Sequence, residues 1–595
     1  MLAFSRSSKV RLAGLTLGIL CGLATAGSAP AAEAIVAKGI DQLELRDHRG
    51  GRHDFSSYDQ DQLIVVVFLG TECPLARMYA PRLVELKQEF SARPVTWVGV
   101  VSNTQDSDDE ISRFVEDCGV DFPVLIDRDC AAANCLGAQR TPEAFVLDGQ
   151  RTIRYRGRID DQFAVGLKRP QVGRRDLAEA LHELLAHKPV TQPQTAAAGC
   201  IIGRPKQPAA DAAITFTKHV APILNARCVS CHRAGEIAPF SVTSYDEVVG
   251  WADTIVETVD AGRMPPWFAS PEHGQFINDA RLTEAEKRTL RTWAKNGCPP
   301  GDPQDAPEPP VFSKGWNIPK PDVVVPMSKE PYHVAATGVI PYEHFVADPG
   351  FTEDKWVVAT EVRPGNRSVV HHVLVFLLKP GDTSTMRILS GELIGAFAPG
   401  SPARAARPGL ALKIPAGSKI LFQMHYTVNG QETTDLSTLG LKFCDASEVR
   451  QEITSGWAVN FNLAIPPGAS DYPVKSRYRF KEDRLLYQLT PHMHLRGKSF
   501  RYEAIYPDGR KETLLDVPKF DFNWQIDYLL AEPKLMPKGT VLHCTATFDN
   551  STNNPSNPDP TQRVVFGEQT WDEMMIGWFS TTSLPSEKTA AVSVE

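Results

Sequence analysis

The segment Cys228-Val229-Ser230-Cys231-His232 divides the chain of 595 residues into two parts with different sequence patterns. Its two cysteines are separated by two residues, and a histidine follows at once. Cysteines with this spacing can each form a thioether with a haem vinyl group, while the adjacent imidazole reaches the iron. The segment therefore predicts one covalently bound haem c, held by Cys228, Cys231 and His232. The alternative is a chance pair of cysteines followed by a surface histidine.

The residues around this segment predict a helical domain over 214–303. Apolar residues recur at helical spacing over Ser244 to Ala261 and over Thr283 to Asn296, and the second stretch opens with a capping box. The region resembles a small cytochrome c domain. That resemblance makes Met264, which precedes two prolines, the expected sixth ligand of the iron. The alternative is Met264 as core filler, with His273 or no side chain on the iron.

The composition is that of a globular protein with several domains. The chain has 42% hydrophobic and 23% charged residues and a formal net charge of -8. Domains hold roughly 150 residues each, so several are expected. The acidic balance supplies no basic surface for a phosphate backbone, which argues against a nucleic-acid partner.

The N-terminus has the three parts of a secretory signal. Basic residues precede an apolar run from Leu12 to Ala24, and small residues continue to Ala32. We therefore expect a signal peptide over 1–32, cleaved after Ala26 or nearer Ala32, and a mature protein that is periplasmic or secreted. No later stretch is apolar over the length of a membrane helix, so no transmembrane segment is expected in the mature chain.

The first domain, over 40–187, alternates strands and helices. Leu63 to Leu69 predicts a buried strand, Leu75 to Phe90 a helix and Val95 to Val101 a second buried strand. Thr141-Pro142 then leads into another apolar strand. This order, with a cysteine in the first turn and a Thr-Pro step that looks like a cis-proline loop, resembles the thioredoxin-like redoxins.

Cys73 is the candidate nucleophile of this domain. It directly precedes the predicted helix, and the positive end of a helix dipole lowers the pKa of a thiol. Ala76 stands where a dithiol oxidoreductase has its second cysteine, which excludes exchange within one CxxC motif. Three other cysteines are candidates to resolve an oxidised Cys73, namely Cys118, Cys130 and Cys135. The alternative is a redoxin fold kept for docking, with Cys73 buried or disulfide-bonded.

Residues 188–213 are rich in Pro, Ala, Gln and Gly and lack periodicity, which predicts a linker. Cys200 and Cys298 flank the predicted haem domain and are able to pair, but sequence alone does not assign a disulfide.

The C-terminal half has the pattern of β-sandwiches. Apolar strands separated by Pro/Gly turns recur there, as at Trp356–Val362, Val369–Leu378, Ile420–Val428 and Phe500–Tyr506. Pro466-Pro467-Gly468 predicts a break between two halves, 317–466 and 467–590.

Three histidine groups lie in this half: His371-His372, His425, and His492 with His494. Alternate residues of a strand share a face, so His492 and His494 project together while Met493 points away. Adjacent His371 and His372 diverge unless the strand is bulged or ends there. Cross-strand packing is the alternative for any single group, but three groups together favour metal binding.

The order of these groups, followed by Asp572-Glu573-Met574, resembles the type II copper monooxygenases, the family of peptidylglycine α-hydroxylating and dopamine β-monooxygenases. The resemblance implies two tandem jelly-roll sandwiches with two coppers facing each other across a cleft. His371, His372 and His425 would hold the copper that relays electrons. His492, His494 and Met574 would hold the copper at which dioxygen is activated. A strand over Trp571–Phe579 would point Met575 away from the metal.

The ligand chemistry agrees with copper, because imidazole suits both copper states and a thioether favours Cu(I). The sequence thus predicts an α/β thioredoxin-like domain, an all-α cytochrome c domain and two all-β sandwiches. The predicted activity is hydroxylation of a C–H bond with dioxygen. The partners are an unidentified small-molecule or peptide-like substrate and an electron donor, either an ascorbate-like reductant or a periplasmic redox protein. Alternatives are an electron-transfer or copper-handling protein, or a thiol peroxidase centred on Cys73.

Overall fold

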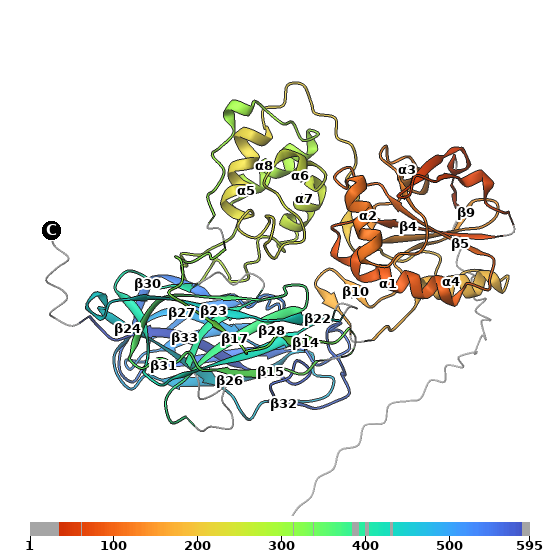
Figure 1. Ribbon diagram of the computed structural model, residues 1–595. Helices are drawn as coiled ribbons and strands as arrows, with labels where there is room; N and C mark the ends of the chain where they lie inside the picture. The colour runs from red at the N-terminus through yellow and green to blue at the C-terminus, as the bar shows by residue number, and fades with distance from the viewer. Residues whose placement is uncertain are drawn as a thin grey trace, which may run out of the picture.

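The computed structural model describes three regions: an N-terminal α/β domain, a helical domain and a large all-β region (Figure 1). The described residues are 35–37, 39–60, 62–169, 171–312, 315–336, 338, 340–382, 392–398, 404–428 and 432–585. The predicted signal peptide lies outside these residues. No helix in the described part of the chain is long and apolar enough to cross a membrane.

The N-terminal domain is built on an eight-stranded sheet. Its order is β1 (Ile35–Val36), β9 (Thr152–Gly157), β8 (Glu143–Leu147), β4 (Leu63–Leu69), β5 (Val95–Val101), β6 (Val124–Ile126), β2 (Glu44–Asp47) and β3 (Arg52–Asp54). Strands β4 and β5 have the predicted bounds and run parallel, while β8 is antiparallel to β4. The continuous apolar sequence of β4 follows from its position, because both faces of this strand are covered.

Helices cover both faces of that sheet. Alternate residues of β4, such as Val65 and Val67, pack with α1 (Pro74–Glu89), α2 (Asp108–Asp117) and α4 (Asp176–Leu185). The intervening residues, such as Ile64 and Val66, pack with α3 (Ala131–Leu136) on the other face. Helix α1 begins directly after Cys73, as predicted.

The segment predicted as a linker adds a short strand to this domain. Within 188–213, β12 (Cys200–Ile201) pairs antiparallel with β7 (Arg140–Thr141). Main-chain hydrogen bonds hold such an added strand, and these need no periodic side-chain pattern. A hairpin of β10 (Phe163–Ala164) and β11 (Leu167–Lys168) extends from the same domain.

The helical domain contains α5 (Ala221–Arg227), α6 (Tyr245–Val249), α7 (Ala252–Asp260) and α8 (Glu284–Lys295). A π-helical turn, Phe216–Val220, precedes α5. Helix α8 starts at the predicted capping box of Thr283 and Glu286. The single helix predicted over Ser244 to Ala261 is divided into α6 and α7, because the chain turns at Gly250.

The all-β region is organised around one nine-stranded sheet. Its order is β13 (Val323–Pro326), β23 (Thr438–Cys444), β16 (Lys355–Arg363), β20 (Leu410–Ile414), β24 (Gln451–Val459), β33 (Ile576–Thr582), β27 (Arg484–His492) and β30 (Tyr528–Met536), with β19 (Arg404–Ala405) paired to β16. Two-stranded ladders join β14 (Tyr332–Val334) to β22 (Thr433–Asp435) and β25 (Ala464–Ile465) to β32 (Val564–Val565).

Two four-stranded sheets pack on this sheet and give each half its own core. The first is β15 (Glu343–Ala347), β21 (Lys419–Tyr426), β17 (Val370–Leu378) and β18 (Glu392–Phe397). The second is β26 (Tyr472–Arg479), β31 (Val541–Phe548), β28 (Gly497–Ile505) and β29 (Lys511–Val517). The parallel pair β20 and β24 joins the halves. Strand β24 thus belongs to the second half, although it precedes the predicted break at 466.

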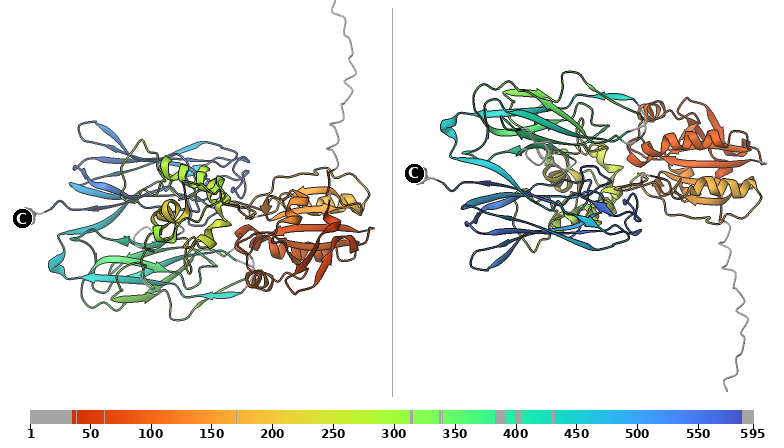
Figure 2. Two further views of the ribbon diagram at one scale, coloured as in Figure 1. Left: turned by 90° about the horizontal axis from the view of Figure 1, so that it is seen from above. Right: turned by 90° about the horizontal axis from the view of Figure 1, so that it is seen from below.

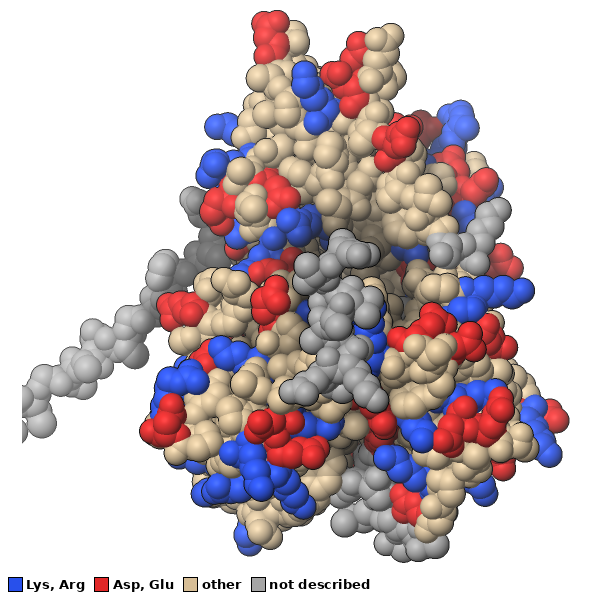
Figure 3. All heavy atoms as spheres, turned by 90° about the vertical axis from the view of Figure 1, so that its left-hand side faces the viewer, with Lys and Arg blue, Asp and Glu red and all other residues tan. Residues whose placement is uncertain are grey.

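The helical domain lies over the seam between the two halves of the all-β region (Figure 2). Its segment 267–278 packs on the second half. Trp267 joins the core of that half, and the main-chain N–H of Ile277 donates to the carbonyl of Leu529 at 2.9 Å. Charges of both signs are interspersed over the face in Figure 3.

Candidate functional site

The first histidine cluster, His371, His372 and His425, lies where β17 and β21 pair. The register places Val370 opposite Tyr426 and His372 opposite His425, so His371 is the extra residue of a β-bulge. This is the irregularity that two adjacent histidines need in order to face one point. The Nδ1 atom of His372 lies 3.1 Å from Nδ1 of His371 and 3.4 Å from Nδ1 of His425.

Burial leaves this cluster uncharged and ready to bind a metal. His372 is 2% exposed, and its Nε2 has no hydrogen-bond partner among the described residues. Burial lowers the pKa of His371 to about 4 and lowers the pKa values of His372 and His425 well below the usual range for histidine. One ligand atom from each ring lies within 4.8 Å of the others. Three neutral imidazoles that converge in this way fit a transition metal such as copper.

The second histidine cluster, His492 and His494, lies in the other half. The Nδ1 atom of His492 is 3.0 Å from Oε1 of Gln525, and Nδ1 of His494 is 3.3 Å from the carbonyl oxygen of Asp572. The Nε2 atom of His494 is buried without a partner among the described residues. Met493 is fully buried in the core, so it points away as predicted.

Met574 lines the same small cavity as His492 and His494, whereas Met575 packs in the core of the second half. The predicted strand over Trp571–Phe579 is wrong in its start, because β33 begins at Ile576. The backbone before it turns instead, and Glu573 exchanges hydrogen bonds with the main chain of Val565 and Gly567. The two methionines nevertheless face opposite ways.

A buried carboxylate organises this cluster. Glu573 is fully buried and accepts hydrogen bonds from the main-chain N–H groups of His494 at 2.8 Å, Arg496 at 2.7 Å and Met574 at 3.1 Å. It therefore fixes the backbone of one histidine and of Met574 at the same time.

Two aromatic rings lie between the clusters. Phe522 stacks on His371 with ring centroids 5.6 Å apart and lies 6.1 Å from the ring of His494. Tyr342 lies 4.7 Å from the ring of His425 and 6.5 Å from that of His494. The small cavity at the second cluster is only about 10 Å³. Rings thus occupy the space between the clusters, where the resemblance implied a cleft. Neither ring belongs to a recognisable sequence motif.

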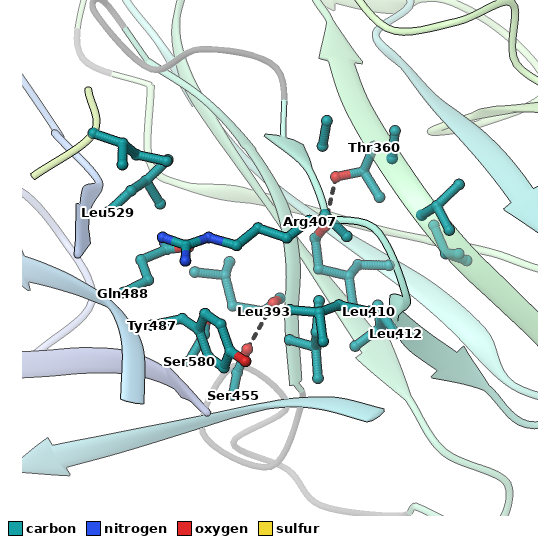
Figure 4. A pocket seen from close by; sticks show the side chains of 18 residues that line it. Thr360, Leu393, Arg407, Leu410, Leu412, Ser455, Tyr487, Gln488, Leu529 and Ser580 are labelled. Atoms are coloured by element: carbon teal, nitrogen blue, oxygen red, sulfur yellow. Dashed lines mark hydrogen bonds between the residues drawn. The ribbon is translucent and has the colours of Figure 1, made fainter. Parts of the chain in front are cut away.

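A larger cavity of about 140 Å³ lies between the two halves (Figure 4). Its lining is mostly apolar, with Leu393 and Leu412 from the first half and Leu529 from the second. Arg407 reaches into it over the ring of Tyr487, at 5.5 Å. The cavity contains none of the histidines, so it offers room for an apolar group rather than for a metal.

The predicted haem ligands lie at the end of α5 and in the turn after it. Cys228 and Cys231 are free thiols, so both sulfurs are available for thioethers. The Nδ1 atom of His232 lies 3.1 Å from the carbonyl oxygen of Phe240, which leaves Nε2 for an iron. Burial lowers the pKa of His232, which favours the neutral ring that a metal needs. Met264 is half-buried in the loop after α7.

Cys73 is fully buried at the start of α1, and its Sγ lies 2.9 Å from the carbonyl oxygen of Thr141. A hydrogen bond with Cys200 lowers the pKa of the Cys73 thiol to about 6. Cys130 and Cys135 pack in the core on the opposite face of the sheet. The structure therefore brings Cys200 to Cys73, and not either of those two candidate partners.

The comparisons agree with this part of the fold. Residues 36–156 match the AhpC/TSA family. The N-terminal domain is a thioredoxin-like redoxin domain, which indicates an oxidoreductase activity in general. No curated protein matches the chain.

Solved structures similar to the chain match between 20% and 27% of it in the three examples below. A hypothetical protein of Sinorhizobium meliloti 1021 is 24% identical, with 27% of this chain and 90% of that one covered and a TM-score of 0.25. A secreted disulfide oxidoreductase of Mycobacterium tuberculosis is 20% identical, with 20% and 83% covered and a TM-score of 0.18. Peroxidoxin BcpB of the same organism is 21% identical, with 24% and 89% covered and a TM-score of 0.19.

The redoxin domain also reaches the first histidine cluster. Asn523, the neighbour of Phe522, donates from Nδ2 to the carbonyl oxygen of Gly166 in the β10–β11 hairpin at 3.1 Å. The positive charge of Lys168 in the same hairpin adds to burial in lowering the pKa of His371. Sequence patterns carried no signal for this contact, because it joins residues more than 300 positions apart.

Proposed function

We propose that this chain is an exported copper-dependent monooxygenase that hydroxylates a C–H bond with dioxygen. Its electrons would come from a haem c in the helical domain or from an external reductant. The observation that carries the proposal is the pair of histidine clusters with two aromatic rings between them. Each cluster has one buried Nε2 atom, that of His372 or His494, with no hydrogen-bond partner among the described residues.

The donor atoms fit copper better than other common metals. The first cluster offers three imidazoles, and the second offers two imidazoles and the thioether of Met574. Calcium and magnesium prefer oxygen ligands, while imidazole and thioether suit copper. When bound, copper would supply one-electron redox chemistry and the activation of dioxygen. Three protein ligands at the second cluster leave a coordination position open.

The chain's own residues orient the ligands and exclude water. The Nδ1 atoms of His492 and His494 are hydrogen-bonded to the side chain of Gln525 and to the carbonyl of Asp572. The Nε2 atom of each ring is then the one left for a metal. Tyr342 and Phe522 fill the space between the clusters. A dry site protects reactive oxygen species from protons of the bulk solvent.

The contacts of the helical domain with both halves of the all-β region support its proposed role as electron donor. Glu236, four residues after His232, forms an ion pair of 3.1 Å with Arg367, four residues before His371. On the other half, Nδ2 of Asn278 donates to the carbonyl of Asp527 at 2.6 Å. A haem held by Cys228, Cys231 and His232, with Met264 as the other axial ligand, would supply electrons one at a time.

The substrate would use the apolar cavity between the halves. Its leucine lining suits a hydrocarbon group, and Arg407 suits a polar or anionic end. The proposed substrate is therefore a small molecule or a peptide-like compound that carries a hydrocarbon group and a polar or anionic end.

Two alternatives make different predictions. An electron-transfer or copper-handling protein would bind copper without incorporating oxygen. A thiol peroxidase centred on Cys73 is favoured by the AhpC/TSA match, but the full burial of this thiol opposes direct attack by a peroxide.

The test supplies the copper-loaded full chain with ascorbate, ¹⁸O₂ and a panel of apolar small molecules and peptides. The proposal expects a product that carries one ¹⁸O atom. It expects this product to disappear in His492→Ala and to persist in the matched control His333→Ala, whose ring is exposed. Copper binding with dioxygen reduction but without labelled product across the panel would favour the electron-transfer alternative.

A further inference from the structure

The chain segment 199–203 lies across the redoxin domain beside Cys73. Its β12 strand places Cys200 opposite Thr141, whose carbonyl oxygen is 2.9 Å from Sγ of Cys73. Two main-chain hydrogen bonds fix the segment after Cys200. The N–H of Ile202 donates to the carbonyl of Gln139 at 2.9 Å, and the N–H of Gly203 donates to Oδ1 of Asn103 at 3.0 Å.

The sequence of the segment is adapted to this close approach. Gly199 has a φ of 140°, and a Cβ atom at this position would lie 2.0 Å from the carbonyl oxygen of Thr141. Any other residue would push the segment away from the sheet. Nη1 of Arg140 donates a hydrogen bond to the carbonyl oxygen of Gly199 at 2.8 Å. A glycine therefore directly precedes the cysteine that the segment delivers.

We propose that Cys73 and Cys200 form a reversible disulfide, in which Cys200 supplies from a distant segment the second sulfur that Ala76 does not provide. Both thiols belong to the core that packs on α1, and Cys200 stands opposite the residue whose carbonyl oxygen contacts Sγ of Cys73. In an ordinary dithiol oxidoreductase both sulfurs lie in one helical turn. Here the second sulfur arrives on a strand, in the manner of a bound peptide.

The two sulfurs have unequal acidities, as a dithiol centre requires. The hydrogen bond from Cys200 lowers the pKa of Cys73, and the N–H of Ala76 in α1 acts in the same direction. The hydrogen bond to Cys73, together with burial, raises the pKa of Cys200. At neutral pH the pair therefore carries one proton, held by Cys200. Cys73 is then the thiolate of the pair, which accepts the proton of Cys200 in the first step and closes the disulfide in the second.

The oxidant is a disulfide, either a small molecule or another protein. Cys200 is the partly exposed member of the pair, so it reacts first. The thiolate of Cys73 accepts the proton of Cys200 as the sulfur of Cys200 attacks the external disulfide, which forms a mixed disulfide and releases the first external thiolate. Cys73 then gives this proton to the first external thiolate, and its own thiolate attacks Sγ of Cys200 and releases the second external thiolate. Two electrons pass from the protein pair to the external disulfide.

The disulfide would also fasten the helical domain. The N–H of Ile201, next to Cys200, donates to Oγ1 of Thr254 in α7 at 3.0 Å. Arg140, on the strand that pairs with β12, forms an ion pair with Glu257 of the same helix. The bond would therefore join the redoxin domain to the residues that contact α7, and its reduction would release that link.

The first test equilibrates the full copper- and haem-loaded chain without oxygen in glutathione buffers, alkylates the remaining thiols in acid and identifies the peptides by mass spectrometry. The expected result is a single new disulfide between Cys73 and Cys200 under oxidised glutathione, reversed by reduced glutathione. In Cys200→Ser this peptide pair must be absent, while in the matched variant Cys118→Ser it must form as in the wild type. Pairing of Cys73 with Cys118, Cys130 or Cys135, or Cys73 recovered as an alkylated thiol, would overturn the proposal.

A second measurement follows the rate of alkylation of Cys73 by iodoacetamide as a function of pH. The wild type is expected to reach half of its maximal rate near pH 6, because the thiolate is the reactive form. Cys200→Ala removes the hydrogen bond, so the midpoint is expected to rise by about one pH unit or more. An unchanged midpoint in a folded Cys200→Ala protein would mean that the two sulfurs are not paired.

Discussion

In the first histidine cluster the Nδ1 atoms of His371, His372 and His425 point at one another, whereas in the second cluster other groups occupy the Nδ1 atoms. The first arrangement comes from a bulge in a strand pair and surrounds one point with three rings. The second depends on partners outside the cluster, which are Gln525, Asp572 and the buried Glu573. We therefore expect the first cluster to retain a metal through its three rings, and the second to orient a metal through its outer partners.

The largest effect is expected from Met574, which should separate the two clusters by function. Met574→Ile is expected to abolish hydroxylation, because the thioether tunes the metal of the second cluster. Copper should stay bound at the first cluster, whose three ligands are histidines of other strands. The matched variant Met575→Ile lies in the core and is expected to cost about 1 kcal/mol of unfolding free energy with activity retained. Product formation and chemical denaturation measure these effects. The reverse result, in which Met575→Ile is inactive and Met574→Ile is active, would reject the placement of Met574 at the metal.

The next effect concerns metal retention at the first cluster. His372→Ala removes the ring that contacts both of its neighbours, so copper affinity there is expected to fall by about 100-fold or more. The second cluster should keep its metal, because its ligands come from other strands. Competitive titration with a copper chelator measures both sites, and His333→Ala is the control. Equal loss from both clusters would show that they are not independent sites.

A smaller effect is expected from the outer partner of the second cluster. Gln525→Leu keeps a similar volume and removes the acceptor for Nδ1 of His492, so copper affinity at the second cluster should fall by about 10-fold. The first cluster has no such dependence and should be unaffected. The same chelator titration resolves the two values. An unchanged second site would mean that Gln525 does not orient His492.

The smallest effect is expected from the thiol. Cys73→Ser should leave copper content and oxygenase turnover with an artificial reductant within about threefold of wild type, because the redoxin thiol contacts neither histidine cluster and dithiol exchange has its own reactants. Copper analysis and the rate of dioxygen uptake check this. If turnover were lost while copper stayed bound, the redoxin thiol would belong to the route that delivers electrons.

Sequence patterns predicted the parts of the fold that depend on short-range order. The buried strands β4 and β5 were recognisable because both faces are apolar, and α8 because Thr283 and Glu286 form a capping box. The alternation of His492, Met493 and His494 also predicted which side chains point together. Each of these signals is contained within fewer than about 20 neighbouring residues.

The remaining features depend on long-range pairing, which leaves no local pattern. Cys200 is opposite Thr141 only because β12 adds to β7, and Phe522 meets His371 only because a loop of one half reaches the other. The start of β33 was predicted too early, since the buried Glu573 draws the backbone into a turn. The nine-stranded sheet that joins the two halves was likewise not predicted, because two separate sandwiches would show the same alternation in every strand.

If each histidine cluster holds a copper ion and the helical domain holds one haem c, the purified full-length protein must contain both metals in fixed amounts. Elemental analysis combined with the pyridine haemochrome spectrum gives the copper and haem content per chain. The predicted result is two coppers and one covalently bound haem, falling to one copper in His492→Ala/His494→Ala and unchanged in His333→Ala. Protein that binds no copper after loading, or that keeps two coppers in His492→Ala/His494→Ala, would contradict the account.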